Sequence, residues 1–321
     1  MYKEADRTVW TGRVDGSQEN CLRYHQIVNY QSIVEAKDSV VLLSFACDEG
    51  VRRNFGRTGA KDGPVAIKKS LASIPWNGVN NIKLVDVGTV CCDDSKLEQA
   101  QVLLGEKINI LLQHRNRPII LGGGHETVYG HYLGVRQAAG STSKIGILNI
   151  DAHFDMRSSN QGVSSGTMFY QILNEDDNAQ YMVIGIQKFG NTKALFERAQ
   201  AFQVQYILEE QLTEQSEEIW QQQIQHFIEK QDIVIVTLCM DVVNASAAPG
   251  VSAPSVFGLS PQLVRKLLRY IMQFNQVMSF DICEVNPSVD EGERTAKLAA
   301  YFVNEVVYEL AKNSSNLLRK K

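Results

Sequence analysis

The sequence predicts a three-layer α/β/α fold with a mainly parallel, eight-stranded sheet. Short runs rich in β-branched and other apolar residues alternate with longer amphipathic stretches along the chain. Several of these runs are apolar at nearly every position, which is typical of parallel strands that helices cover on both faces. Eight strands alternating with helices indicate one α/β domain over residues 1–321.

The strand predictions follow the apolar runs. They are SVVLLSF (39–45), IKLVDV (82–87), PIIL (118–121), KIGILNI (144–150), YMVIGI (181–186), VQYIL (204–208), IVIVTLC (233–239) and VMSFDIC (277–283). Helices are expected between and after them, among others over 96–115, 216–230, 260–273 and 294–312.

Two helix starts are marked by their residues. Ser260 and Pro261 have the pattern of an N-cap followed by the first helical position, and Pro64 opens a helix in the same way. The loop 241–259 is rich in Ala, Ser, Pro and Gly and could be a linker. Because it follows a strand and precedes a capped helix, we interpret it as an active-site loop.

Composition narrows the classes of function. The net charge of -4 gives no reason to expect nucleic acid or an acidic membrane as a partner. The first ten residues, MYKEADRTVW, have no apolar run typical of a signal peptide, and no stretch is long enough to span a bilayer. The six cysteines lack CxxC spacing. We therefore expect a cytoplasmic protein that acts on a small molecule.

Polar residues gather directly after four of the predicted strands. Strand 118–121 continues into GGGHE, strand 144–150 into DAHFD, strand 233–239 ends in the CMD motif, and strand 277–283 continues into EVNP. In an open parallel sheet, ligands bind beyond the carboxyl ends of the strands. The four motifs are therefore expected to face one site.

The DAHFD motif is typical of a metal site. Two carboxylates and an imidazole within five residues would be costly to bury without a partner, and a divalent cation removes that cost. Mixed carboxylate and imidazole ligands suit manganese or a similar ion, and His125 can complete the set. The alternative is a solvated turn that happens to hold acids and a histidine. Because polar motifs also follow three other predicted strands, we favour the metal site over the solvated turn.

These motifs carry a family resemblance. GGGHE, DAHFD, MDVVNASAAPG and DICEVNP resemble, in this order, the conserved blocks of the arginase/agmatinase (ureohydrolase) superfamily. Further segments resemble its formimidoylglutamase branch: WTGRVDG (10–16), DEGVRRNFGRTGAKDGPVAI (48–67), SSGTMF (164–169), APGVSAPSVFGLSP (248–261) and FDICEVNPSVDEGERTAKLAA (280–300).

The resemblance implies an arginase-like fold and a set of metal ligands. Two Mn²⁺ ions per subunit, sharing a bridging hydroxide, would be held by residues at six positions: His125, Asp151, His153, Asp155, Cys239 and Asp241. Such a metal pair lowers the pKa of water and stabilises a tetrahedral adduct. The resemblance also implies a homo-oligomer.

It also implies roles in catalysis. Asp155 would ligate metal, hold the proton of the hydroxide and pass it to the leaving amine. Glu284 matches the carboxylate that pairs with the planar cationic group of the substrate. The expected reaction is hydrolysis of N-formimidoyl-L-glutamate to L-glutamate and formamide, a late step of histidine breakdown.

Two positions depart from arginases and agmatinases. Those enzymes have a histidine that assists proton transfer at the position of Ser165, whereas the formimidoylglutamase branch has serine there, and Ser165 is expected to contact substrate. Family members usually have Asp-x-Asp at the end of strand 233–239, and this chain has Cys239 in place of the first Asp. A thiolate is softer than Mn²⁺ prefers.

Three arginines follow the first strand of the predicted core. They are Arg52, Arg53 and Arg57, and each of them could simply be solvated. They could also face the site, because they lie on the carboxyl side of the sheet. Formimidoylglutamate carries two carboxylates, which the arginine fork fits well. Arg57 is our choice for a substrate contact. His25, His114, His131 and His226 are expected to be structural or solvated, and Asp281 either orients the site or is structural.

Two alternatives stay open. The chain could hydrolyse another amidine or guanidine, as an agmatinase or a guanidino-acid hydrolase does. The arginines over 52–57 favour an acidic substrate over a cationic amine. It could also be a non-catalytic paralogue, to which Cys239 alone points.

Overall fold

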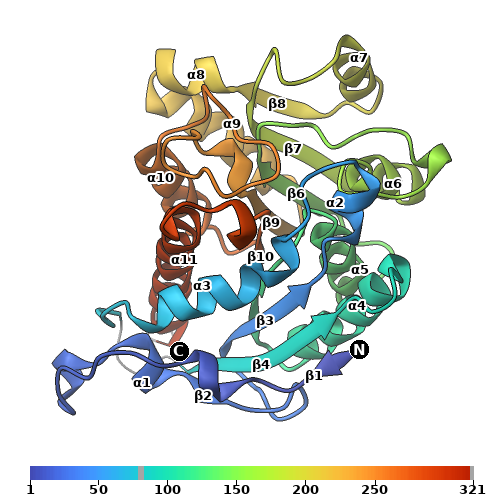
Figure 1. Ribbon diagram of the computed structural model, residues 1–321. Coiled ribbons are helices and arrows are strands. Elements are labelled where there is room, and N and C mark those ends of the chain that lie inside the picture. The colour runs from blue at the N-terminus through green and yellow to red at the C-terminus, as the bar shows by residue number, and fades with distance from the viewer. Residues whose placement is uncertain (79–82, 319–321) are drawn as a thin grey trace.

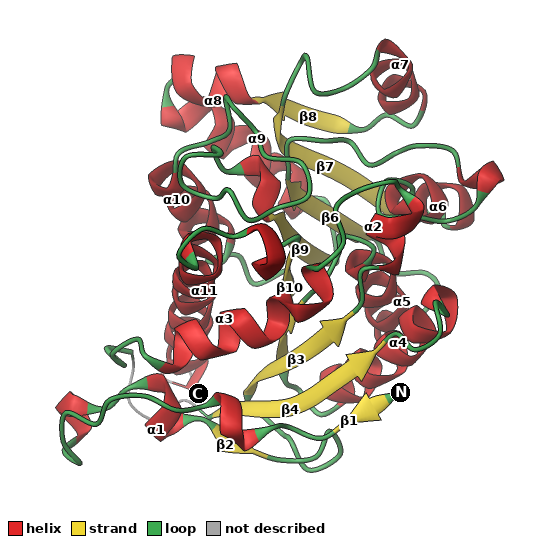
Figure 2. Ribbon diagram, viewed as in Figure 1, coloured by secondary structure: helices red, strands yellow, loops and turns green. Residues whose placement is uncertain are grey.

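The computed structural model describes residues 1–78 and 83–318. Over these ranges the chain forms one sheet with helices on both faces, so the predicted three-layer architecture is confirmed (Figures 1 and 2). The described strands are β1 (Tyr2–Lys3), β2 (Asn29–Tyr30), β3 (Val40–Ala46), β4 (Leu84–Cys91), β5 (Arg117–Leu121), β6 (Ile145–Ile150), β7 (Ala179–Ile186), β8 (Gln205–Leu208), β9 (Ile233–Cys239) and β10 (Val277–Cys283).

The sheet has ten strands within the described residues, two more than the eight predicted. All eight predicted strands are present, and the first residue of the predicted strand 82–87 lies outside the described residues. The two additional strands, β1 and β2, are each two residues long and both pair with β4. Strands of two residues are too short to show an apolar periodicity that would predict them from the sequence.

Strand order explains how distant motifs meet. The order is β1-β4-β3-β5-β10-β9-β6-β7-β8, with β2 also on β4, and every pair is parallel except β1–β4. The four strands that end in polar motifs are therefore consecutive: β5, β10, β9 and β6. Their registers are aligned, with Ile282 opposite Leu121, Cys283 opposite Cys239, and Ile150 opposite Leu238.

The helices divide between the two faces of the sheet. Their bounds are α1 (Tyr24–Ile27), α2 (Glu49–Arg53), α3 (Gly63–Ala72), α4 (Leu97–Gln113), α5 (Thr127–Ala139), α6 (Met168–Glu175), α7 (Lys193–Ala201), α8 (Glu209–Glu214), α9 (Glu217–Glu229), α10 (Pro261–Ile271) and α11 (Arg294–Leu318). The two predicted helix starts are confirmed: Pro64 lies in the first turn of α3, and the Ser260 hydroxyl accepts a hydrogen bond from the backbone N–H of Leu263 at 3.2 Å.

Alternate residues of each strand enter separate cores. On β3, Val40 and Leu42 pack in a cluster with α3, α9, α10 and α11, whereas Val41 and Leu43 pack in a cluster with α4, α5, α6 and α7. Figure 1 shows α3, α10 and α11 on one side of the sheet and α4, α5 and α6 on the other. None of the described helices is long and apolar enough to cross a membrane.

A buried ion pair joins helix α3 to the sheet, and the N-terminal segment hydrogen-bonds to the same carboxylate. The Asp86 carboxylate on β4 lies 2.7 Å from the Lys68 ammonium of α3, and the indole N–H of Trp10 donates to the same carboxylate at 2.8 Å. The side chain of Asp86 is fully buried and that of Lys68 is 5% exposed. Removing one partner of such a pair leaves an uncompensated charge in the core.

We expect Asp86→Ala to lower the free energy of unfolding by about 3–5 kcal/mol, because Lys68 would remain buried without its counter-ion. Urea denaturation measures this change. Glu197→Ala is the control, since Glu197 pairs with Lys193 in an exposed ion pair within α7, and it should have a much smaller effect. Equal effects of the two substitutions would contradict the role given to the buried pair.

Candidate metal centre and active site

The carboxyl ends of four adjacent strands bring the predicted site residues together. His125 follows β5, the DAHFD segment follows β6, Cys239 is the last residue of β9, and Glu284 directly follows β10. The glycines before His125 permit close backbone approach: a Cβ at Gly123 would lie 1.8 Å from the carbonyl oxygen of Cys47. None of the three has a positive φ, so they permit close packing rather than a left-handed turn.

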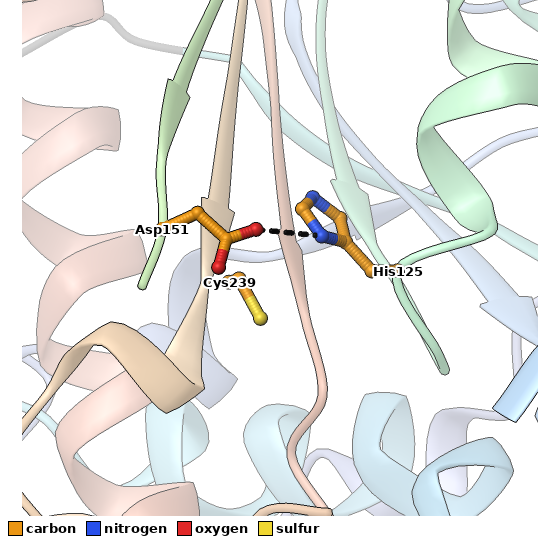
Figure 3. A group of neighbouring side chains, drawn as sticks. All are labelled: His125, Asp151 and Cys239. Atoms are coloured by element: carbon orange, nitrogen blue, oxygen red, sulfur yellow. Dashed lines mark ion pairs between the residues drawn. The ribbon is translucent and has the colours of Figure 1, made fainter. Parts of the chain in front are cut away.

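Two groups of side chains have the composition and spacing of metal ligands. In the first, ligand atoms of His125, Asp151 and Cys239 all lie within 4.8 Å of one another, and His125 Nδ1 is 3.1 Å from Asp151 Oδ2 (Figure 3). In the second, the same limit holds for Asp151, His153 and Asp241, and His153 Nδ1 is 3.2 Å from Asp241 Oδ2. Asp151 belongs to both groups and is the residue that two neighbouring cations would share.

Asp155 joins the first of these groups from the same loop. Its Oδ2 lies 3.1 Å from His125 Nδ1, and its side chain is 18% exposed, more than that of Asp151. Its φ of 48° is in the left-handed region, which is uncommon for a residue with a side chain. Backbone strain of this kind concentrates at functional sites.

Glu284 enters the site from the fourth strand, with a φ of 70°. Its Oε1 accepts a hydrogen bond from the backbone N–H of His125 at 2.9 Å, which fixes the carboxylate beside the predicted ligands. Its Oε2 is buried and has no hydrogen-bond partner among the described residues, and the same is true of Asp241 Oδ1. Buried oxygens without partners are costly, so both indicate a bound group.

Burial and mutual repulsion raise the pKa values of several acidic groups in the site. Burial raises the pKa of Asp241, of Glu284 and of the Cys239 thiol, and neighbouring carboxylates raise all three further. Burial also raises the pKa of Asp155, and the charge of Asp151 adds to this effect. A divalent cation favours the ionised form of each group and would reverse these shifts.

Burial and neighbouring charges act against each other on the pKa values of the two histidines. Burial lowers the pKa of His125, but hydrogen bonds and charges from Asp151 and Asp155 outweigh it and raise that pKa well above its ordinary value. His153 behaves in the same way beside Asp241 and Asp151. These carboxylates therefore favour a positive charge at each imidazole, and a bound metal cation would supply that charge in place of the proton. The donor set fits a pair of divalent cations, with Cys239 as its one soft ligand.

A cavity of about 120 Å³ opens onto these residues. The predicted ligands and catalytic residues that line it are His125, His153, Asp155, Cys239, Asp241 and Glu284. Ser165 lines it too, as do Ser252 and Ala253 of the loop 241–259. That loop therefore lies at the site, as its sequence predicted, and does not serve as a linker.

The three arginines of the segment 52–57 make contacts within the protein. Arg57 donates from its guanidinium to the backbone carbonyl oxygens of Val251 at 2.6 Å and Ser252 at 3.1 Å, and it is not among the residues that line the cavity. Its observed contacts hold the loop, and its role as a substrate contact stays a prediction. Arg52 and Arg53 both pair with the buried Glu49.

Arg157 lines the cavity and was missed by the sequence analysis. It follows DAHFD by two residues, and its Nη1 donates to Asn54 Oδ1 at 2.8 Å. Among the described residues no carboxylate pairs with it within ion-pair distance. Its place in the loop that carries three predicted ligands was the signal in the sequence that could have identified it.

Comparison with known proteins agrees with this geometry. The model of the arginase family matches residues 38–308. The chain is 53% identical over 312 residues to a formimidoylglutamase of Geobacillus sp. (strain WCH70), covering 96% of each chain. It is 48% identical over 316 residues to a formimidoylglutamase of Lysinibacillus sphaericus (strain C3-41), covering 97% of this chain and 98% of the relative.

Solved structures show the same fold. The crystal structure of formiminoglutamase from Trypanosoma cruzi with Mn²⁺ superposes with a TM-score of 0.78 at 26% identity, covering 86% of this chain and 94% of that one. The formimidoylglutamase from Bacillus subtilis subsp. subtilis str. 168 gives a TM-score of 0.83 at 21% identity, covering 93% and 96%. From its sequence and its fold, this chain belongs to the arginase family, in the formimidoylglutamase branch.

Proposed function

We propose that this protein hydrolyses N-formimidoyl-L-glutamate to L-glutamate and formamide, with two Mn²⁺ ions as cofactor, as a step of histidine breakdown. The observation that carries the proposal is that one cavity holds complementary groups for both ends of this substrate. Over residues 1–78 and 83–318, Glu284 offers a buried carboxylate oxygen without a hydrogen-bond partner, and Arg157 offers a guanidinium without a carboxylate partner. The curated relatives named above support the substrate class.

The residues proposed to hold the metals are His125, Asp151, His153, Asp155, Cys239 and Asp241. Mn²⁺ bound there supplies a Lewis acid and makes water nucleophilic at neutral pH. Its binding also relieves the repulsion among the buried carboxylates, because each gains a positive neighbour. Metal should therefore stabilise the fold as well as support catalysis.

Glu284 is proposed to orient the amidine. A planar cationic amidinium matches a carboxylate through two charge-assisted hydrogen bonds. The backbone N–H of His125 already holds Oε1 in place, so Oε2 is available to the substrate. This hydrogen bond also links the position of the substrate to a predicted metal ligand.

Asp155 is proposed to carry the proton. Its carboxylate lines the cavity and is the more exposed of the two aspartates that face His125. It can accept a proton from the attacking water at Oδ2 and deliver it to the nitrogen of the leaving amine. Ser165 lines the same cavity and is proposed to contact the substrate. The homo-oligomer and the cytoplasmic location stay predictions.

The metal centre is tested by Asp151→Asn. Asp151 is shared by both ligand groups, so this substitution should lower Mn²⁺ content and abolish Mn²⁺-dependent turnover, while circular dichroism stays close to wild type. His153→Ala should do the same through the second group alone. Mass spectrometry of bound metal and a formamide-release assay provide the readouts. Full activity of either variant would refute the assigned ligands.

Substrate orientation is tested by comparing two arginines. Arg157→Ala should lower kcat/KM by roughly 10- to 100-fold, since a charge-assisted hydrogen bond contributes about 1.5–3 kcal/mol. Arg57→Ala should have the larger effect if the sequence prediction for Arg57 is correct, and a smaller effect if Arg57 only holds the loop. Steady-state kinetics on both variants separates these outcomes. An unchanged kcat/KM for Arg157→Ala would exclude that contact.

The unusual ligand is tested by Cys239→Asp. An aspartate adds hard oxygen atoms and a negative charge, both of which Mn²⁺ prefers over a thiol. We expect the substitution to raise Mn²⁺ occupancy and to lower the Mn²⁺ concentration needed for half-maximal activity. Cys91→Ser, at a half-buried cysteine at the end of β4 that does not line the cavity, is the control and should leave occupancy unchanged. Two tightly bound Mn²⁺ ions in wild type, with no gain in the variant, would show that Cys239 is a competent ligand.

A further inference from the structure

A line of buried polar side chains begins at His125 Nε2, whereas Asp151 and Asp155 face the other ring nitrogen, Nδ1. His125 Nε2 is 3.0 Å from Thr237 Oγ1 on β9, and Thr237 Oγ1 is 2.6 Å from Asp281 Oδ1 on β10. The other oxygen of Asp281 lies 2.6 Å from His131 Nδ1 on α5, and His131 Nε2 lies 2.6 Å from Ser279 Oγ. All five residues are at most 1% exposed.

The direction of the first hydrogen bonds follows from the chemistry of the groups. An ionised carboxylate only accepts, so the single hydroxyl proton of Thr237 is donated to Asp281. Thr237 Oγ1 must then accept toward His125, which places a hydrogen on His125 Nε2. The lone pair of the neutral imidazole is thereby at Nδ1, the atom that faces Asp151 and Asp155.

The outer members of the line hold Asp281 in place. His131 Nδ1 donates to Asp281 Oδ2, and the Cys283 thiol is 3.2 Å from Asp281 Oδ1. Both carboxylate oxygens therefore have a partner other than Thr237. Ser279 and His131 are joined in turn. Hydrogen bonds in a site without solvent are strong and mutually reinforcing, and a carboxylate fixed from several sides keeps its hydrogen-bond geometry.

We propose that Thr237, Asp281 and His131 are positioning residues that select the metal-binding tautomer of His125 and fix the orientation of its ring. The inference rests on the proposed metal site, because it assigns His125 Nδ1 as the ligand atom. The three residues lie on β9, β10 and helix α5, and they extend the proposed metal site beyond its ligands. Outer partners of this kind commonly change metal affinity by about 10- to 100-fold when they are removed.

A purely structural role makes a different prediction. If the line only satisfied buried polar groups, substitutions would lower stability and leave the Mn²⁺ affinity of the folded protein unchanged. If it positions His125, affinity should decrease most for the member that contacts the imidazole and less for the members farther away. Restoring the hydroxyl alone should restore affinity.

The experiment measures Mn²⁺ affinity of the metal-stripped protein by titration, with free Mn²⁺ followed by electron paramagnetic resonance. Thr237→Val keeps the shape of the side chain and removes the acceptor, and it should weaken binding by about 10- to 100-fold. Thr237→Ser keeps the hydroxyl and should bind close to wild type. Asp281→Asn should give an intermediate loss, and it carries the test if Thr237→Val does not fold.

The control is Ser44→Ala, which removes a buried hydroxyl that has no hydrogen-bond partner among the described residues. It should bind Mn²⁺ as wild type does. Wild-type affinity in both Thr237→Val and Asp281→Asn would overturn the inference and leave the metal site intact. The same holds if Thr237→Ser binds as weakly as Thr237→Val. Absence of Mn²⁺ binding by wild type would overturn the proposed metal site itself, and the inference with it.

Discussion

The register among β5, β10, β9 and β6 is the constraint on which the rest of the site depends. It places Cys283 beside Cys239 and Ile150 beside Leu238, so four strands end at one level and their next residues face the same space. A slip by one residue would turn every side chain of a strand to the opposite face. The site is therefore as rigid as the central sheet, and the two hydrophobic cores that fix the sheet also fix the ligands.

Electrostatics set the second constraint. Carboxylates from three loops are buried within hydrogen-bond distance of two histidines, and burial and repulsion raise the pKa of Asp155, Asp241 and Glu284. The strands keep these groups together although repulsion opposes it. A site organised before the cation arrives is what electrostatic catalysis requires, because the donors need no reorganisation during the reaction.

Much of this arrangement could be predicted from the sequence because the determining patterns are local. Apolar runs predicted the eight longer strands, and polar residues at their ends predicted that His125, Asp151, His153, Asp241 and Glu284 lie together at one edge of the sheet, as they do. The two-residue strands β1 and β2 were missed because they have no periodicity. Arg57 illustrates another limit: its contacts are with the backbone of Val251 and Ser252, 194 and 195 residues away in sequence, and no local pattern shows such contacts.

The partners of His125 show the same limit more sharply. Asp281 was expected either to orient the site or to be structural, but Thr237 lies inside an apolar strand, where a single polar residue has no pattern of its own, and His131 lies within a helix. Only the pairing of β9 with β10 and the packing of α5 against them bring the three together. Such contacts depend on tertiary structure, whereas strand-end motifs depend on a few consecutive residues.

The most direct measurement of the proposed function is kcat/KM for N-formimidoyl-L-glutamate, agmatine and arginine in the presence of Mn²⁺. Arg157 provides a partner for a substrate carboxylate, and agmatine has an amine in place of that group. Arg157 is exposed where it lines the cavity, and its positive charge favours a substrate carboxylate over the ammonium group of agmatine. The account predicts clear preference for formimidoylglutamate over both guanidine substrates. Equal or greater kcat/KM on agmatine would contradict it.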